Sequence, residues 1–226
     1  MKRALLTLAA VLLCSSQLTS FAADKPHDFA KWEKEIAAYE SSDRTNPPPK
    51  NAWLFIGSST VRLWKSLAQD FPQHQVINRG FGGSEIVDST HFAERIVFPY
   101  APQKIFLRAG GNDIHAGKSP EQVFGEYKEF VAKVQMSLPE TEIMFLGLSP
   151  SIARWSEAKD NRTLNQLVEA YVKGKKHLGY IETYDTVLGA DGKPRPELFV
   201  ADKLHFNAEG YKLLTKHVQA WLAEHK

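Results

Sequence analysis

Short apolar runs alternate with stretches of helical periodicity along most of the chain. Five of these runs are nearly continuous in apolar residues, as is typical of parallel strands that helices cover on both faces. The runs span residues 52–57, 75–78, 104–108, 142–148 and 180–183. Helical patterns lie between them, near residues 60–70, 84–97, 119–137 and 156–178. The alternation predicts right-handed crossovers and an α/β fold, a three-layer α/β/α sandwich with a central five-stranded parallel sheet.

Helical patterns also lie at the two ends of this region. Apolar residues recur at helical spacing from 27 to 42 and predict an amphipathic helix, which Asn46 and three consecutive prolines end. Asn207 is placed to cap a last helix, because an Asn side chain accepts hydrogen bonds from first-turn N–H groups. The pattern predicts an N-terminal helix and Pro-rich linker at residues 24–50, followed by one domain at residues 51–226.

Residues 1–23 have the pattern of a cleavable secretory signal peptide. Lys2 and Arg3 form a positively charged start, and residues 4–13 form an apolar run that is too short to span a bilayer. Small residues follow, so we expect cleavage after Ala22 or Ala23. The alternative is an uncleaved helix at a membrane interface. The signal predicts a periplasmic or secreted bacterial protein, with no stable membrane insertion.

Charge and cysteine content exclude several classes of protein. The 226 residues hold 28 Lys and Arg against 26 Asp and Glu, and cleavage removes two of the bases, which leaves 26 against 26. A near-neutral chain is not a nucleic-acid binder held by bulk charge. The only cysteine, Cys14, lies in the predicted signal, so the mature chain has no thiol for catalysis or for a cysteine-based zinc site. No spacing of His, Asp and Glu suggests a metal site, and we expect no cofactor.

Three of the apolar runs are followed by motifs whose residues could take part in binding or catalysis. Functional groups of a parallel sheet gather at the carboxyl ends of its strands. Gly57-Ser58-Ser59 presents a hydroxyl at a helix start, where N–H groups favour negative charge; the alternative is a serine N-cap. The glycine-rich loop at residues 78–83 allows close approach of a ligand, or is a plain turn. Gly110–Asp113 offers the Asn112 amide as a donor, or is ordinary turn chemistry.

A fourth motif, Asp202-Lys203-Leu204-His205, precedes the last helix. A carboxylate three residues before a histidine can orient the imidazole ring as a base. The same spacing occurs at Asp24/His27 and Asp88/His91, but only the third pair lies in a loop between the last strand and the last helix.

Several cations lie at or just beyond strand ends. Arg79, Arg108 and Arg154 are there either for structural ion pairing or to bind an anionic substrate. We take Arg79 and Arg154, together with His115 beside the Asn112 motif, as candidate substrate-binding residues.

The four motifs in this order resemble the SGNH hydrolases, the GDSL-type esterases and acylhydrolases, over about residues 50–225. The chain is most similar to small secreted enzymes related to platelet-activating-factor acetylhydrolase subunits. The resemblance implies a flavodoxin-like fold with Ser59 as nucleophile, His205 as base and Asp202 as the residue that orients it. It also implies an oxyanion hole made of the Ser59 and Gly83 N–H groups and the Asn112 side chain. Many members have Gly-Asp-Ser where this chain has Ser58 in the middle, and the motif register assigns the attack to Ser59.

The resemblance implies hydrolysis of carboxylic esters through an acyl-enzyme on Ser59. No long apolar lid segment is visible, which favours short acyl or acetyl groups on a small-molecule, glycan or lipid ester. An acyltransferase, or a carbohydrate O-acetylesterase acting on cell-envelope glycans, would use the same residues. A non-catalytic anion- or carbohydrate-binding α/β module is a further alternative, but it gives no reason for Asp202 and His205 to accompany Ser59. The sequence leaves the oligomeric state open.

Overall fold

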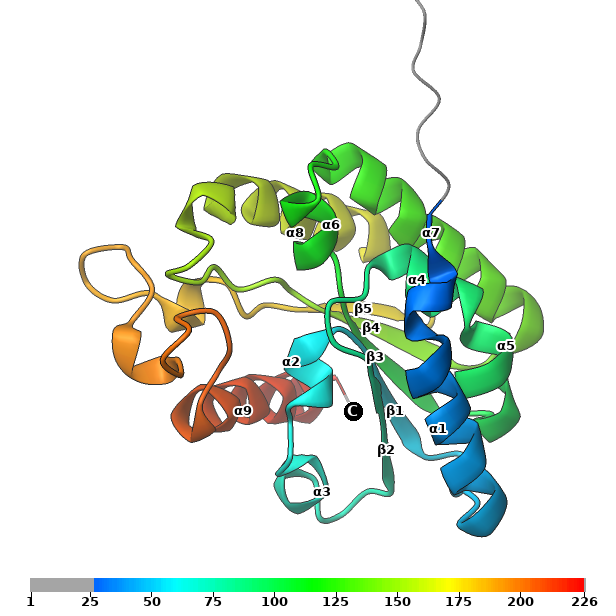
Figure 1. Ribbon diagram of the computed structural model, residues 1–226. Coiled ribbons are helices and arrows are strands. Elements are labelled where there is room, and N and C mark those ends of the chain that lie inside the picture. Colours follow the sequence, from blue (N-terminus) through cyan, green and yellow to red (C-terminus); the bar gives the residue numbers. More distant parts are fainter. Residues whose placement is uncertain (1–26, 226) are drawn as a thin grey trace, which may run out of the picture.

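The computed structural model describes residues 27–225 and contains a five-stranded, all-parallel sheet (Figure 1). The strands are β1 (Trp53–Gly57), β2 (Val76–Gly80), β3 (Lys104–Arg108), β4 (Glu142–Leu146) and β5 (Leu178–Ile181), in the order β2-β1-β3-β4-β5. The predicted five-stranded parallel sheet is therefore confirmed. The predicted signal peptide, residues 1–23 with Cys14, lies outside the described residues.

Helices cover both faces of the sheet, which confirms the predicted three-layer sandwich (Figure 1). One face carries α1 (Glu33–Thr45), α4 (Ile86–His91), α5 (Ala93–Ile96), α7 (Pro120–Ser137) and α8 (Ala158–Val172). The other carries α2 (Ser59–Arg62), α3 (Leu67–Asp70) and α9 (Ala208–Glu224). Side chains alternate along each strand: Leu54 of β1 packs under the first set of helices, and Phe55 packs under the second.

The N-terminal helix belongs to the same hydrophobic core as the sheet. It begins as a 3₁₀ turn at Phe29–Trp32 and continues as α1 to Thr45, directly before Asn46 and the prolines, as the pattern predicts. Trp32 and Ile36 are buried in the core beneath the helices of this face. Because the helix is packed on the sheet, its side chains reach the edge where β1 and β2 end.

Some predicted helices are shorter or broken. The pattern near 84–97 forms α4 and α5, separated at Phe92, and the pattern near 60–70 forms α2 and α3. The pattern near 156–178 gives α8, which ends at Val172, and Gly174 follows in the left-handed conformation that commonly ends a helix. Asn207 caps α9 as predicted, with its side chain accepting from two backbone N–H groups. A short helix, α6 (Gly111–His115), was not predicted.

Within residues 27–225, no helix is both long enough and apolar enough to cross a bilayer.

Candidate active site

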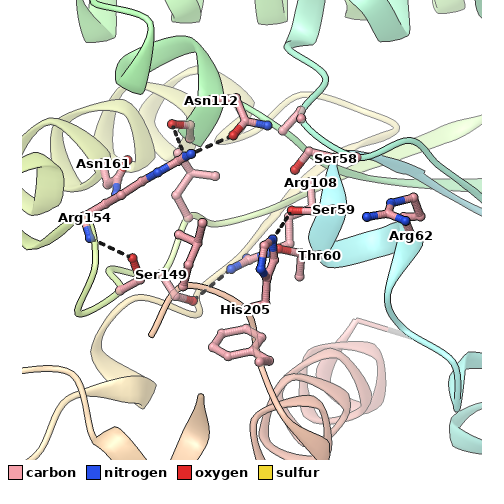
Figure 2. Close-up of a pocket in the computed structure, with 18 of the residues that line it drawn as sticks. Ser58, Ser59, Thr60, Arg62, Arg108, Asn112, Ser149, Arg154, Asn161 and His205 are labelled. Atoms are coloured by element: carbon pink, nitrogen blue, oxygen red, sulfur yellow. Dashed lines mark hydrogen bonds between the residues drawn. The ribbon is translucent and has the colours of Figure 1, made fainter. Parts of the chain in front are cut away.

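The predicted Ser–His–Asp residues come together at the carboxyl edge of the sheet. Figure 2 shows the side chains of Ser59 and His205 facing each other. Ser59 is the first residue of α2, directly after β1, and His205 lies in the loop before α9. The Ser59 Oγ lies 2.9 Å from the His205 Nε2, although the two residues are 146 positions apart in the chain. The His205 Nδ1 lies 2.7 Å from the Asp202 Oδ2. This geometry is a connected hydroxyl–imidazole–carboxylate line.

The loop around Asp202 fixes the orientation of the imidazole. The other carboxylate oxygen, Oδ1, accepts hydrogen bonds from the backbone N–H groups of Leu204 at 2.8 Å and His205 at 2.9 Å. The His205 ring and these two N–H groups lower the pKa of Asp202 to about 2. The carboxylate is therefore charged at neutral pH and holds the ring proton on Nδ1. This leaves Nε2 of the neutral ring as an acceptor for the Ser59 hydroxyl.

Close backbone contacts position the turn that carries Ser59. Gly57 has φ +134°, and a Cβ at this position would overlap the carbonyl oxygen of Arg108 on the neighbouring strand. The Ser58 N–H donates to that same oxygen at 3.1 Å, and the Phe81 N–H donates to the Gly57 carbonyl at 2.9 Å. The turn is thus bonded to the ends of both adjacent strands, β2 and β3. Ser59 consequently starts its helix with its hydroxyl facing His205.

The Asn112 amide has a defined orientation beside this serine. Its Nδ2 donates to the Ser84 carbonyl at 2.9 Å. Its Oδ1 accepts from the Arg154 guanidinium at 3.0 Å, a bond drawn in Figure 2. A carbonyl only accepts and a guanidinium only donates, so the two partners together exclude the flipped amide. Gly83 has φ +80°, and a Cβ there would lie 3.2 Å from the Trp32 ring. The Trp32 indole, at the start of the N-terminal helix, therefore packs against the loop that contains the Gly83 N–H.

One pocket of about 280 Å³ contains most of the predicted site residues. Ser59, Gly83, Asn112, Arg154 and His205 all line it. Asp202 lies behind the imidazole. His115 is more than half exposed and does not line the pocket, but its Nδ1 lies 2.6 Å from the Oε1 of Glu157, which does. Its expected contact with substrate is therefore at most indirect.

Arg79 is directed away from this pocket, so the expectation that it binds substrate is not supported by its position. Its guanidinium forms an ion pair with Asp43 at 2.5 Å and donates to the Tyr100 hydroxyl at 2.8 Å. The rings of Tyr39 and Tyr100 both lie within 5 Å of it. The structural alternative, ion pairing, accounts for this arginine, which ties α1 to β2.

Of the two other Asp/His spacings in the sequence, the one that lies within the described residues, Asp88/His91, does not form a pair of the Asp202/His205 kind. Instead, Asp88 lies 2.8 Å from the Nε2 of His27, which is 61 residues away, and His91 stacks on Phe29. Asp24 lies outside the described residues. The Asp88 carboxylate also accepts from the Glu85 N–H and so fixes the start of α4.

Sequence reasoning missed several residues that shape the site. Trp32 was predicted only as part of an apolar helix face, and nothing in the sequence pairs it with a glycine about fifty residues further on. Two further residues line the pocket: Ser149, which follows β4, and Asn161, which lies in α8. Their only sequence signal is a position beyond a strand end or on a helix face. Among residues 27–225, no three His, Cys, Asp or Glu side chains are grouped as a metal ion would require.

Asp113, directly after Asn112, links the two segments that hold the predicted oxyanion donors. Its fully buried carboxyl group accepts from the Ile86 N–H at 2.9 Å, which joins α6 to the start of α4 after the glycine loop. Lys118 lies 2.7 Å from Glu85, 2.6 Å from Glu126 and 4.0 Å from Asp113. Burial raises the pKa of Asp113 well above its usual range, and the neighbouring Glu126 carboxyl raises it further.

We expect this group to make the protein less stable as the pH rises from about 4 towards neutrality and beyond. The folded state retains the Asp113 proton at pH values where the unfolded chain has lost it. Since the folded state then binds more protons, the free energy of unfolding falls with rising pH in this window. Asp113→Asn should flatten the dependence of Tm on pH between 4 and 9. The exposed Asp160→Asn is the matched control, and parallel curves for Asp113→Asn and the wild type would contradict the prediction.

A Ser–His–Asp line at the carboxyl edge of a parallel sheet is the architecture of a serine-type hydrolase. The model of the GDSL-like Lipase/Acylhydrolase family matches residues 55–213, and the chain belongs to this family. It is 27% identical over 166 residues to the platelet-activating factor acetylhydrolase IB subunit alpha1 of Bos taurus. The aligned region covers 70% of this chain and 69% of the relative.

Solved structures share the fold at lower identity. A Streptococcus pneumonia protein named for platelet activating factor gives a TM-score of 0.76 at 22% identity, over 85% of this chain and 93% of that one. An acetylxylan esterase from Geobacillus stearothermophilus gives a TM-score of 0.61 at 12% identity, over 76% and 94%. The sheet and its helices thus have the SGNH-type α/β fold, and the protein is a hydrolase of ester bonds.

Proposed function

We propose that the protein hydrolyses carboxylic esters with short acyl groups, acetyl above all, through an acyl-enzyme on Ser59. The observation that carries the proposal is the line from the Ser59 Oγ to the His205 Nε2 at 2.9 Å and from its Nδ1 to Asp202 at 2.7 Å. A serine hydroxyl is a weak nucleophile until a neighbouring base takes its proton. The charged Asp202 keeps the ring in the tautomer that can do so.

In the first half of the reaction, the Ser59 oxygen attacks the ester carbonyl and its proton passes to the His205 Nε2. The carbonyl oxygen becomes an oxyanion, which the N–H groups of Ser59 and Gly83 and the Asn112 amide stabilise. When this tetrahedral adduct collapses, the bond to the alcohol breaks and His205 gives its proton to the leaving alkoxide. The products are a free alcohol and an acyl group on Ser59.

In the second half, water takes the place of the alcohol. His205 removes a proton from the water as its oxygen attacks the acyl carbonyl, and the same three donors stabilise the second oxyanion. Collapse releases the carboxylic acid, and the Ser59 oxygen takes back its proton from His205. If a sugar hydroxyl replaced the water, the same steps would transfer the acyl group, which is the acyltransferase alternative.

The size of the pocket supports a short acyl group. Its walls combine hydroxyls, guanidinium groups and amides with apolar side chains, namely Leu148, Phe199, Leu204 and Phe206. With a volume of about 280 Å³ it lies at the lower end for small-molecule sites, so a long alkyl chain would find little room there. The names of an acetylhydrolase and an acetylxylan esterase among the similar proteins favour an acetyl ester, and the second makes a carbohydrate O-acetyl ester the next candidate. The signal-like pattern of residues 1–23 supports action in the periplasm or outside the cell.

A panel of p-nitrophenyl esters from acetyl to palmitoyl, assayed beside acetylated sugars in the presence of EDTA, tests this function. We expect kcat/KM for the acetyl ester to exceed that for the palmitoyl ester by on the order of tenfold or more, since a pocket of about 280 Å³ leaves little room for added methylenes to contribute to transition-state binding. A serine-directed phosphonate should add one group to the protein, at Ser59 by peptide mass spectrometry. A preference for palmitoyl, or labelling at another residue, would contradict the proposal.

A further inference from the structure

The arginines of the protein differ in how their charges are balanced. Residues 27–225 contain eight of them, and Arg79, Arg95, Arg162 and Arg195 each have a carboxylate oxygen within 4.0 Å. The other four form no such ion pair within the described part of the chain: Arg44, Arg62, Arg108 and Arg154. Three of these four, all except Arg44, line the pocket beside Ser59. The unbalanced positive charge of the described arginines is therefore concentrated at the candidate active site.

Arg108 shows that this charge is built into the pocket rather than scattered on its rim. The side chain leaves the end of β3 and is only 5% exposed. Its guanidinium donates to the Gly147 carbonyl, and at 3.1 Å to the hydroxyls of Thr183 and Ser149. All these partners are neutral, so the hydrogen bonds hold the group in place without cancelling its charge. Burial lowers the pKa of Arg108, as expected for a cation without a counter-ion.

Arg154 adds a second cation on the side of the β4 loop. It donates to the Asn112 Oδ1 at 3.0 Å and to the Gly111 carbonyl at 3.3 Å, and both acceptors are again neutral (Figure 2). Arg62, at the end of α2, packs over Gly82 of the glycine loop. The single acidic side chain that lines the pocket among the described residues is Glu157, and its Oε1 is engaged by His115. The lining therefore carries three positive charges against one negative charge.

We propose that the physiological substrate is an ester that carries a negatively charged group, a carboxylate or a phosphate, and that Arg108 and Arg154 bind this group beside Ser59. The proposal rests on the ester hydrolysis proposed above and adds the charge of the substrate to it. A desolvated guanidinium gains most from an anion, to which it donates paired hydrogen bonds. A positive pocket also raises the local concentration of anionic substrates and their rate of association.

A rival explanation is that Arg154 acts only by polarising the Asn112 amide towards the oxyanion. In that case its removal would slow every ester by the same factor, because the oxyanion is common to all of them. If Arg154 binds an anionic group of the substrate, its removal slows the anionic ester more than a neutral ester of the same shape. The ratio of kcat/KM for such a pair separates the two roles.

Two matched pairs of substrates place the charge on either side of the ester bond. 4-Acetoxybenzoate and its methyl ester differ by a charge on the alcohol part, and mono-4-nitrophenyl glutarate and its methyl ester differ by a charge on the acyl part. Each rate is corrected with the Ser59→Ala protein as the blank. We expect the wild type to prefer the anionic member of at least one pair by about tenfold at low salt, and the preference to decrease as salt screens the charges.

Arg154→Gln and Arg62→Gln should each reduce this preference several-fold. Arg44→Gln removes the same charge from an exposed position at the end of α1 and should leave the ratio unchanged. Arg108→Gln is expected to abolish the preference. Since this buried change can also prevent folding, the two more accessible variants are the primary test. Ratios near one in the wild type for both pairs, or equal losses on both members of a pair, would overturn the proposal.

A binding measurement separates failure of this inference from failure of the proposed function. In the Ser59→Ala protein, 4-acetoxybenzoate should raise Tm more than its methyl ester does, whether or not the wild type turns it over. Hydrolysis of neutral esters without any anion preference would refute only the inference. Absence of any Ser59-dependent hydrolysis would refute the proposed function, and equal Tm shifts with the two ligands would then refute the inference as well.

Discussion

Replacing Ser59 by alanine is expected to lower kcat for ester hydrolysis by about 10⁴–10⁶, the usual cost of removing a triad member. The change deletes the oxygen that would carry the acyl group and leaves His205 without its partner at 2.9 Å. The side chain is half-buried at a pocket wall rather than in the core, so folding should be retained. Steady-state kinetics on p-nitrophenyl acetate, with Tm measured on the same sample, check both expectations.

Ser58→Ala is the matched control, because it removes the same hydroxyl one position earlier. Ser58 also lines the pocket, but its side chain makes no capping hydrogen bond to α2. It precedes the helix, and its contact with β3 is through its backbone N–H to the Arg108 carbonyl, which alanine keeps. We expect this variant to retain most of the activity. A dead Ser58→Ala beside an active Ser59→Ala would show that the motif register is wrong by one residue.

The sheet could be predicted because its strands are buried on both faces and therefore read as apolar runs. The predicted ends of three runs differ from the strands. β2 continues past residue 78 to Gly80, and β5 spans Leu178–Ile181 where the run is 180–183. The run 142–148 passes the end of β4 at Leu146, since Leu148 stays buried. The Leu148 N–H is bonded to the Asn165 side chain instead of a neighbouring strand. An apolar run reports burial, and burial continues where strand pairing has ended.

The residues of the candidate site could be predicted only where the signal is local. Ser59, Asn112 and the Asp202–His205 loop each sit in a short motif next to a strand or helix end. The partner of Arg79 is Asp43, which is 36 residues away on α1, and no local pattern indicates that pair. The distinction between the paired Arg79 and the unpaired Arg108 and Arg154 therefore needed the structure, because it depends on which helices pack on which edge of the sheet.

The Asn112 amide is expected to contribute more to the transition state than to substrate binding. Replacing Asn112 by alanine should lower kcat by about 10²–10³, or roughly 3–4 kcal/mol, with little change in KM, because the amide would bond to an oxyanion that forms only during the reaction. The amide is held for this role by the Ser84 carbonyl on one side and Arg154 on the other. p-Nitrophenyl acetate is the appropriate substrate, since a neutral ester has no anionic group that the Arg154 guanidinium could bind.

The same two hydrogen bonds provide a competing structural role, and Tm separates it from catalysis. Losing them should cost about 0.5–1.5 kcal/mol each at most, a modest decrease in Tm beside the large decrease in kcat. If Asn112 only shaped the turn between β3 and α6, the variant would lose stability in proportion to its rate. Arg154→Gln tests the point from the other side, since it weakens the support of the amide while leaving the amide in place, and should lower kcat on the neutral ester far less than Asn112→Ala. An unchanged kcat in a well-folded Asn112→Ala protein would remove this residue from the mechanism.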